Sequence, residues 1–438
     1  MSFGALLIAG LTLAAPPRLV AELESVQQAG LFPVPGLDPE SRTGFDDGSQ
    51  TLFRWILRPS LEGLYETRRQ EFSLSYRPRF LTQVNLDAGD ERDVAGPLIL
   101  HRGALDHVWH FDRGGDMNSR VYVESGEADV VLIAEGIAAD EGPIGNVPPA
   151  PVIGYTTVGG SSEISLRTGN VESFTVGLES QYLVSSTEEE EGIALLPFYR
   201  LGTFVEYSHY LFPRLDGLID IRMSHVEFFE EDRQSRQASM RAGVGWQQRR
   251  NLAWDFRAGV QVIVGEGRPL EEGGPPPQID GAFPSGRLSL DWTFLQGAQG
   301  VAVLTSGLGV DAFIDPTFGA YIPRAVLDVG LTIFQPWGRF TTVGSATTPI
   351  VENVASETSF LPTFYRVRAE LELPASPYVY FFMRGVVSQR APSFFEPDFA
   401  FGFTEAVGEF GVRLWWSSGR DPRLPRPSER MDEDEFED

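Results

Sequence analysis

Most of the sequence between residues 51 and 416 alternates between apolar and polar residues with a period of two. In the segment 251–264 most even positions are apolar, whereas Asp255, Arg257 and Gln261 occupy odd ones. Because successive side chains of a β-strand point to opposite faces, this period predicts strands with one apolar and one polar face. Helical periodicity is weak throughout the region, so the sequence predicts an all-β protein.

The length of the segments favours a membrane barrel over a soluble sheet. They extend for about 10 to 16 residues, whereas soluble strands average about 5–6 and a transmembrane β-strand needs about 9–11. Arginine occurs at mid-strand positions that the core of a sandwich could not hold. We predict a single transmembrane antiparallel up-and-down β-barrel, with a soluble all-β repeat protein as the alternative. Aromatic residues lie near segment ends, at Tyr65, Trp109, Trp246, Trp337, Trp415 and Trp416.

The number of strands follows from the connections between segments. About 17 segments can be counted, but bacterial single-chain barrels have even strand numbers and short periplasmic turns. Connections after odd-numbered segments are short, as at 248–250, and those after even-numbered ones are long, as at 135–150. The first and last segments then run in the same direction, so one strand is missing. It lies within 19–50, or else 51–69 is two strands broken at Pro59; we prefer 18 strands, with 16 as the next choice.

The last segment carries a motif typical of outer-membrane barrels. Residues 409–416 (EFGVRLWW) fit the order polar, any, glycine, any two, apolar, any, aromatic. This order resembles the signal by which the barrel-assembly machinery recognises a final strand, and it assigns Glu409, Gly411, Leu414 and Trp416 to that role. Alternation places the even positions towards lipid and the odd positions towards the lumen.

Both ends of the chain are expected to lie outside the barrel, which we assign to residues 51–416. Residues 1–15 are predicted to be a signal peptide, because their apolar run is too short to cross a bilayer as a helix, although no basic residue precedes it. Residues 16–50 are an N-terminal periplasmic segment or an unrecognised first strand. Residues 417–438, rich in proline and then acidic, are predicted to be a disordered periplasmic tail. An exported protein without cysteine suits the cell envelope of a Gram-negative bacterium, and we expect this one in the outer membrane.

Composition excludes several kinds of chemistry. The chain of 438 residues has no cysteine, and all 35 of its basic residues are arginine. There is therefore no disulfide framework, thiol nucleophile, P-loop or Schiff-base lysine. The net charge of −26 argues against nucleic acid as a partner. The near-neutral mean hydropathy leaves no room for a bundle of membrane helices.

Charged residues on the polar faces form the candidate site. We interpret them either as a ladder of salt bridges that stiffens the wall or as a lining that hydrogen-bonds sugars or anions. The five histidines are interpreted as residues of the membrane interface or the lumen. The acidic run 188–191 is interpreted as a solvated loop, with calcium bridging to lipopolysaccharide as the alternative. We expect no metal site, cofactor or enzymatic activity. The predicted lumen-lining residues are Arg77, Arg79, Arg241, Asp255, Arg257, Asp291, Arg366, Arg368, Glu370, Glu372 and Arg413.

Four stretches resemble one group of envelope proteins. Residues 57–61 (LRPSL), 71–80 (EFSLSYRPRF), 101–103 (HRG) and 107–109 (HVW) are similar to β-barrel porins of myxobacteria and related bacteria. That group includes barrels paired with polysaccharide-export systems. The resemblance implies an outer-membrane barrel of about 18 strands. It also implies a short periplasmic export protein, without its own membrane segment, as a partner.

The function expected first is therefore a conduit that exports polysaccharide across the outer membrane together with a periplasmic export protein. A general or substrate-selective porin is the alternative, because a barrel of about 16–18 strands can hold an aqueous lumen. A structural or adhesin-like barrel without transport activity is the second alternative. Further expected partners are outer-membrane lipid, lipopolysaccharide and the barrel-assembly machinery.

Overall fold

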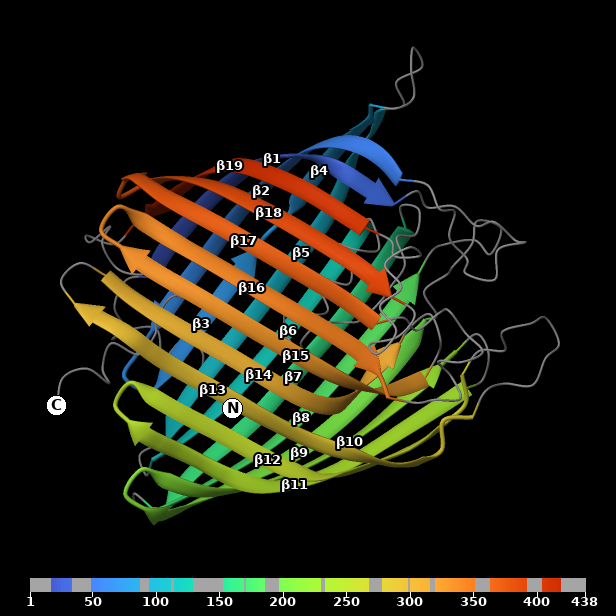
Figure 1. Ribbon diagram of the computed structural model, residues 1–438, viewed down its shortest axis with the longest axis vertical. Helices are drawn as coiled ribbons and strands as arrows, with labels where there is room; N and C mark the ends of the chain where they lie inside the picture. The colour runs from blue at the N-terminus through green and yellow to red at the C-terminus, as the bar shows by residue number, and fades with distance from the viewer. Residues whose placement is uncertain are drawn as a thin grey trace, which may run out of the picture.

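The computed structural model describes residues 17–33, 49–86, 94–111, 114–128, 153–168, 171–185, 197–229, 233–267, 278–297, 300–315, 320–350, 363–391 and 404–418. Every regular element within these ranges is a β-strand, and the strands form one sheet (Figure 1). No helix in this part of the chain is long and apolar enough to cross a membrane. The predicted signal peptide, most of the predicted tail and the acidic run 188–191 lie outside the described residues.

The strands have the following bounds: β1 (Arg18–Pro33), β2 (Ser49–Glu66), β3 (Gln70–Tyr76), β4 (Arg79–Asn85), β5 (Val94–Phe111), β6 (Gly115–Ala128), β7 (Ile153–Thr168), β8 (Glu172–Ser185), β9 (Phe198–Phe212), β10 (Leu215–Phe228), β11 (Arg233–Arg249), β12 (Leu252–Gly265), β13 (Gly281–Gly297), β14 (Gly300–Asp315), β15 (Ala320–Gln335), β16 (Gly338–Pro349), β17 (Thr363–Ser376), β18 (Val379–Ala391) and β19 (Thr404–Ser417).

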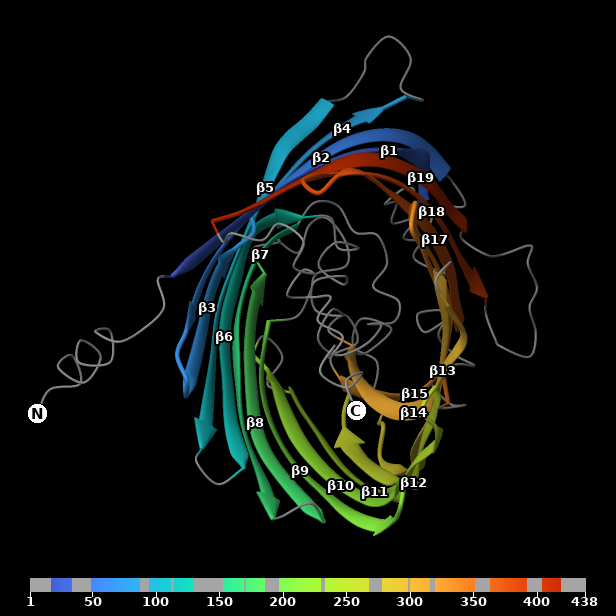
Figure 2. The same cartoon turned by 90° about the vertical axis from the view of Figure 1, so that its left-hand side faces the viewer.

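The sheet closes on itself, because the first strand pairs with both the second and the last. β1 pairs antiparallel with β2 and with β19, from Val20 opposite Ser417 to Leu31 opposite Ala406. Apart from β3 and β4, which do not pair with each other, the other strands pair antiparallel with their neighbours in sequence, and Figure 2 shows the strands curving round into one wall. Closure leaves no strand edge for lipid to face, which is the condition for a sheet to span a bilayer.

The wall has 18 strand positions, as predicted. β3 and β4 both pair with β2 and with β5, so together they fill one position. The interruption between them falls at Arg77 and Pro78, since proline cannot donate a ladder hydrogen bond. The missing strand is β1, which lies within 19–50 apart from its first residue. The alternative of a break at Pro59 is wrong, because β2 continues through that residue opposite Leu23.

Short and long connections lie at opposite ends of the barrel. Connections such as 213–214 and 336–337 have two or three residues, whereas those at the other end include 34–48 and 129–152. The N-terminal end of β1 and the C-terminal end of β19 both lie at the end of the barrel that has the short turns. This arrangement follows from the even strand number, because an up-and-down barrel with an even count returns the chain to the end where it began.

The two faces of the wall differ in chemistry as the alternation predicts. The outer face carries exposed apolar side chains, among them Leu74 (62%), Val121 (56%) and Val367 (55%). The inner face carries buried charged side chains, including Asp220, Arg241 and Glu372. An apolar band outside and a polar surface inside is the pattern of a barrel that sits in lipid and encloses water.

One hairpin of the wall bends into the barrel. Tyr321, at the start of β15, donates its backbone N–H to Ser235 Oγ of β11 at 3.2 Å, although β12, β13 and β14 separate the two strands in the sheet. Tyr321, Ile322 and Arg324 are almost fully buried. In Figure 2 the ends of β14 and β15 turn from the wall towards the inside of the barrel. The wall itself therefore narrows the passage at this level.

Candidate functional site

Alternation and strand register place the predicted lumen residues on the inner face. Arg413, for example, lies opposite Glu24 in the ladder between β19 and β1, and Glu370 lies opposite Arg384 between β17 and β18. The predicted set divides into two groups on different parts of the wall and several separate residues. Arg368, Glu370, Glu372 and Arg413 join one group, and Arg241, Asp255 and Arg257 join the other.

The first group, which we call the seam network, lies on both sides of the junction between β19 and β1. Its five arginines and five glutamates alternate, so their formal charges balance. Arg413 binds Glu24 at 3.0 Å and Glu22 at 3.0 Å. Arg384 joins Glu409 at 2.7 Å to Glu370 at 3.0 Å. The members are Glu22, Glu24, Arg58, Arg339, Arg368, Glu370, Glu372, Arg384, Glu409 and Arg413.

The ring of Phe382 packs at the centre of the seam network. It is 1% exposed, and the guanidinium groups of Arg384 and Arg413 lie 5.5 Å and 5.3 Å from its centroid. A Cβ atom on Gly411 would overlap this ring, so only glycine fits at that position of the last strand. The glycine of the predicted assembly motif therefore has a packing role in the structure. Glu409 lies on the inner face with it, whereas Leu414 and Trp416 lie on the outer face and are exposed.

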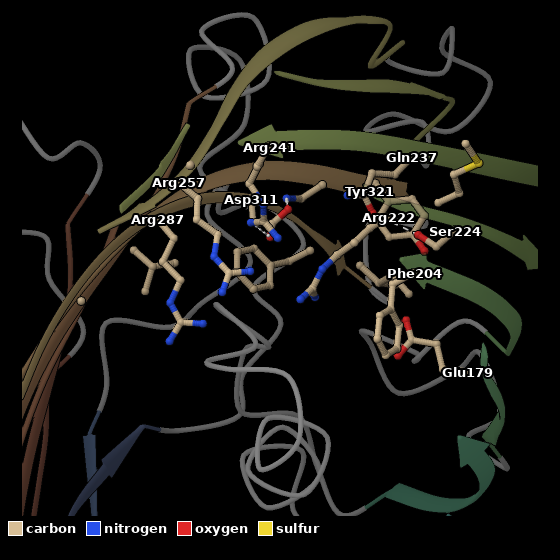
Figure 3. Close-up of a pocket in the computed structure, with 18 of the residues that line it drawn as sticks. Glu179, Phe204, Arg222, Ser224, Gln237, Arg241, Arg257, Arg287, Asp311 and Tyr321 are labelled. Carbon is tan, nitrogen blue, oxygen red and sulfur yellow. Dashed lines mark hydrogen bonds and ion pairs between the residues drawn. The ribbon is translucent and has the colours of Figure 1, made fainter. Parts of the chain in front are cut away.

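The second group surrounds a cavity of about 590 Å³ on the inner face of β8 to β15, which we call the arginine cavity. Figure 3 shows Arg222, Arg257 and Arg287 extending into it. Tyr321 and Phe313, from the hairpin that bends inward, also line it. The charged lining residues are Glu179, Arg200, Arg222, Arg241, Arg257, Arg287, Asp311 and Asp328.

Three of the five arginines in this cavity are neutralised by partners. Asp220, which is 1% exposed, accepts hydrogen bonds from Arg241 at 2.8 Å and from Arg257 at 3.3 Å. Arg241 also binds Asp311 at 3.0 Å. Arg257 has further ion pairs with Asp255 at 2.9 Å and Glu206 at 3.4 Å, and Arg200 binds Glu179 at 2.7 Å.

The other two arginines keep free hydrogen-bonding capacity. Arg222 lies over the Phe204 ring at 5.9 Å, and its shortest ion-pair distance, to Asp220, is 4.0 Å. Arg287 is exposed and has no hydrogen bond or ion pair within the described chain. Stacking on an aromatic ring leaves the edge of a guanidinium available to an anion.

Two glycines make the space beside Arg287. Gly309 is its register partner on β14, and Gly307 is two residues further along that strand on the same inner face. A Cβ atom built on Gly307 would have no heavy atom within 4 Å. The cavity is therefore open beside Arg287, because these two positions, which the sequence alternation marks as inward-facing, carry no side chain.

The remaining predicted lumen residues lie apart from both groups. Arg77 approaches Glu62 at 3.7 Å, and Asp291 lies on the inner face of β13, opposite Thr305 and outside the arginine cavity. Arg79 and Arg366 each have an interaction partner but do not line the cavity. No cluster of histidine and acidic residues suited to a metal ion occurs in the ranges that the structure covers.

The sequence did not single out several residues that the geometry brings to these sites. The cavity is lined or supported by Asp220, Arg222, Arg287 and Asp311. The seam network is completed by Glu24 and Arg384. Asp220, Arg222 and Arg287 lie on the polar face of an alternating segment, so extending the alternation to every strand would have found them. Glu24 could not be found in this way, because its strand was not recognised.

Comparison with known proteins found matches among solved structures. No family model and no curated protein matches the chain. Among solved structures of outer-membrane β-barrels, Pseudomonas aeruginosa OccK7 (OpdD) aligns with a TM-score of 0.45 at 7% identity, covering 92% of this chain and 100% of that one. Pseudomonas aeruginosa OpdL gives 0.41 at 10% identity, covering 92% and 99%. The copper transporter OprC gives 0.43 at 9% identity, covering 92% and 81%.

Proposed function

We propose that this chain is an outer-membrane porin that admits small hydrophilic solutes. The observation that carries the proposal is the arginine cavity: a polar space within the wall, lined by two guanidinium groups that the protein leaves available. A wall of 18 strands is wide enough for an aqueous lumen. Charges kept free on the inner face of such a wall suit the capture and passage of hydrated solutes.

The paired charges of the wall support the same function. The seam network satisfies its own arginines and glutamates, so it stiffens the barrel and presents little free charge to a solute. The arginine cavity differs because Arg287 has no ion pair within the described chain and Arg222 approaches its acidic partner only to 4.0 Å. The charged lining thus serves both roles considered from the sequence, in different places.

Export of polysaccharide, the function expected first, has only the sequence resemblance in its favour. No family model supports that resemblance, and none of the contacts described above points to a long polymer or to a periplasmic export protein. The alternative of a general or substrate-selective porin therefore replaces it as the main proposal.

A barrel without transport activity is the second candidate, and one observation favours it. Apolar residues on the inner face near the long-connection end are completely buried, including Leu183, Val226, Phe228 and Ile263. Fully buried inner residues do not border open water, which favours a lumen that is closed at this level.

Reconstitution distinguishes the two candidates. Purified protein with heat-shifted gel mobility, inserted into liposomes, should allow arabinose to enter and should give discrete current steps in planar bilayers. Folded protein that gives neither swelling nor current steps would establish the closed barrel instead. Recovery of the protein in a soluble periplasmic fraction would contradict the outer-membrane assignment. Loss of a surface polysaccharide on deletion, with co-purification of a periplasmic exporter, would restore the export function.

A further inference from the structure

Two opposite charges on the arginine cavity have no partner in the described chain, and they lie on strands two apart. Arg287 projects from β13 and Asp328 from β15, and neither has a hydrogen bond or ion pair. Among the lining acids, Glu179 and Asp311 bind arginines, so Asp328 alone keeps its full hydrogen-bonding capacity. A charged group in a partly enclosed site without a counterion is costly unless something else neutralises it.

The neighbours of both residues explain why they stay unpaired. Arg287 faces Arg257 on one side, whose charge three acids neutralise, and Gly309 on the other. Asp328 lies opposite Gly307 on β14 and Ser345 on β16. The inner-face positions next to each charge are therefore glycine, serine or an arginine that is already bound.

The strand between them, β14, carries no side chains at the two inner positions beside these charges, and we call this open surface at Gly307 and Gly309 the Gly307 floor. Gly307 and Gly309 occupy the inner positions of β14 between Arg287 and Asp328, and a Cβ atom on Gly307 would meet nothing. Two strand spacings separate the residues by about 10 Å across the sheet, and the register offsets them by two residues, about 7 Å, along it. A short molecule carrying an anion and a cation fits between a long guanidinium side chain and a short carboxylate at this separation.

We propose that the arginine cavity binds small zwitterions of the amino-acid type above the Gly307 floor. The carboxylate of the ligand accepts hydrogen bonds from Arg287, and its ammonium group donates to Asp328. Arg222, stacked on Phe204, offers a second donor to the carboxylate. The proposal deepens the proposed porin function, because a ligand reaches this cavity through the lumen.

A set of ligands of equal length tests the proposal on the full barrel. 4-Aminobutanoate, butanoate, butylammonium and butyramide would be titrated against detergent-solubilised protein by saturation-transfer NMR, which needs no conduction. We expect the zwitterion to bind at least about tenfold more tightly than either singly charged analogue, since each charge-assisted contact contributes about a factor of ten or more. Glycine, β-alanine and 6-aminohexanoate then define the best separation of the charges.

Variants assign each half of the ligand to its partner. Arg287→Gln should weaken 4-aminobutanoate and butanoate about tenfold or more, and Asp328→Asn should weaken 4-aminobutanoate and butylammonium but leave butanoate unchanged. Arg167→Gln and Asp291→Asn are matched controls, because both residues are exposed on the inner face, unpaired within the described strands and outside the cavity. Gly307→Leu should abolish binding without changing charge, whereas Gly344→Leu, on the outer face with equally open space, should not.

The outcomes separate this proposal from the porin proposal. Equal binding of butanoate and 4-aminobutanoate, with no effect of Asp328→Asn, would show a simple anion site and overturn the zwitterion assignment. Equal effects of the control variants would also overturn it, because general lumen charge would then explain binding. Arabinose uptake without zwitterion binding would support the porin function and contradict the proposed binding site. Zwitterion binding without arabinose uptake would support the binding site and contradict the porin function.

Discussion

Arg413 on the last strand donates a hydrogen bond to Glu24 on the first strand at 3.0 Å, across 389 residues of sequence. Both side chains are less than a tenth exposed, and Arg58 on β2 binds the same glutamate at 2.9 Å. The seam of the barrel is therefore joined by side chains as well as by the backbone ladder.

The seam pair should contribute strongly to stability. Removing one partner of a buried ion pair leaves the other charge uncompensated, at a cost of about 3–5 kcal/mol. Arg413→Gln should therefore lower the temperature at which unheated gel mobility is lost, whereas Arg167→Gln, at an exposed inner position, should have little effect. Adding Glu24→Gln to Arg413→Gln should recover part of the loss. Equal stability of Arg413→Gln and wild type would show that the pair is energetically neutral.

Gly411 should be intolerant of a larger residue because of the Phe382 ring. Gly411→Val forces that ring aside, and overpacking of this kind costs about 1–3 kcal/mol. The yield of heat-modifiable barrel should fall, whereas Gly408→Val on the outer face of the same strand should be tolerated, since a Cβ there meets only Ala29 O at 3.9 Å. Recovery of yield in the Gly411→Val variant on adding Phe382→Ala supports packing. Failure to recover would point to recognition by the assembly machinery.

The outer face should reject charge at mid-membrane depth. Val121 lies in the middle of β6 and is 56% exposed, so Val121→Arg should cost about 2–4 kcal/mol. The same change at Val171, in the turn between β7 and β8, should cost much less. Unfolding in urea from liposomes would measure both. Similar costs at the two positions would mean that Val121 does not face hydrocarbon.

The free arginines should set the charge preference of the channel. Replacing Arg222 and Arg287 by glutamine should move the reversal potential in a potassium chloride gradient towards cation preference, because two positive charges are removed from the inner face of the barrel. Raising the ionic strength should reduce the difference from wild type, since salt screens exposed charges. An unchanged reversal potential in the double variant would place the selectivity filter elsewhere.

The architecture was predictable from the sequence because it depends on local alternation. The roughly 17 predicted segments correspond to strand positions of the wall, and one of these positions is interrupted at Pro78. β1 was missed because its outer face includes Ser25 and Gln27, which weaken the apolar signal. The structure accounts for Ser25, whose hydroxyl accepts a hydrogen bond from Trp55 Nε1 at 3.1 Å.

The pairing of charges could not be predicted in the same way. Alternation shows that Arg257 and Arg287 both face inward, but only the register shows that Arg257 meets Asp220 while Arg287 meets glycine. Arg241 reaches Asp311 three strands away, which depends on the curvature of the wall. The sequence does not distinguish an arginine that has ion-pair partners from one that has none. The cavity and its available arginines could therefore be identified only from the three-dimensional structure.

The seam network has a consequence for how the barrel is built. Its arginines and glutamates come from six adjacent wall strands, β16 to β19 with β1 and β2. The β18–β19 hairpin carries one excess positive charge and the β1–β2 hairpin one excess negative charge, so these two hairpins neutralise each other only when the barrel closes. An intermediate in which β19 has not reached β1 would hold Glu24 and Arg413 apart in a medium where unpaired charge is unfavourable. Partly closed forms are therefore penalised relative to both the unfolded and the closed chain. Insertion of this barrel should behave as a cooperative, all-or-none event.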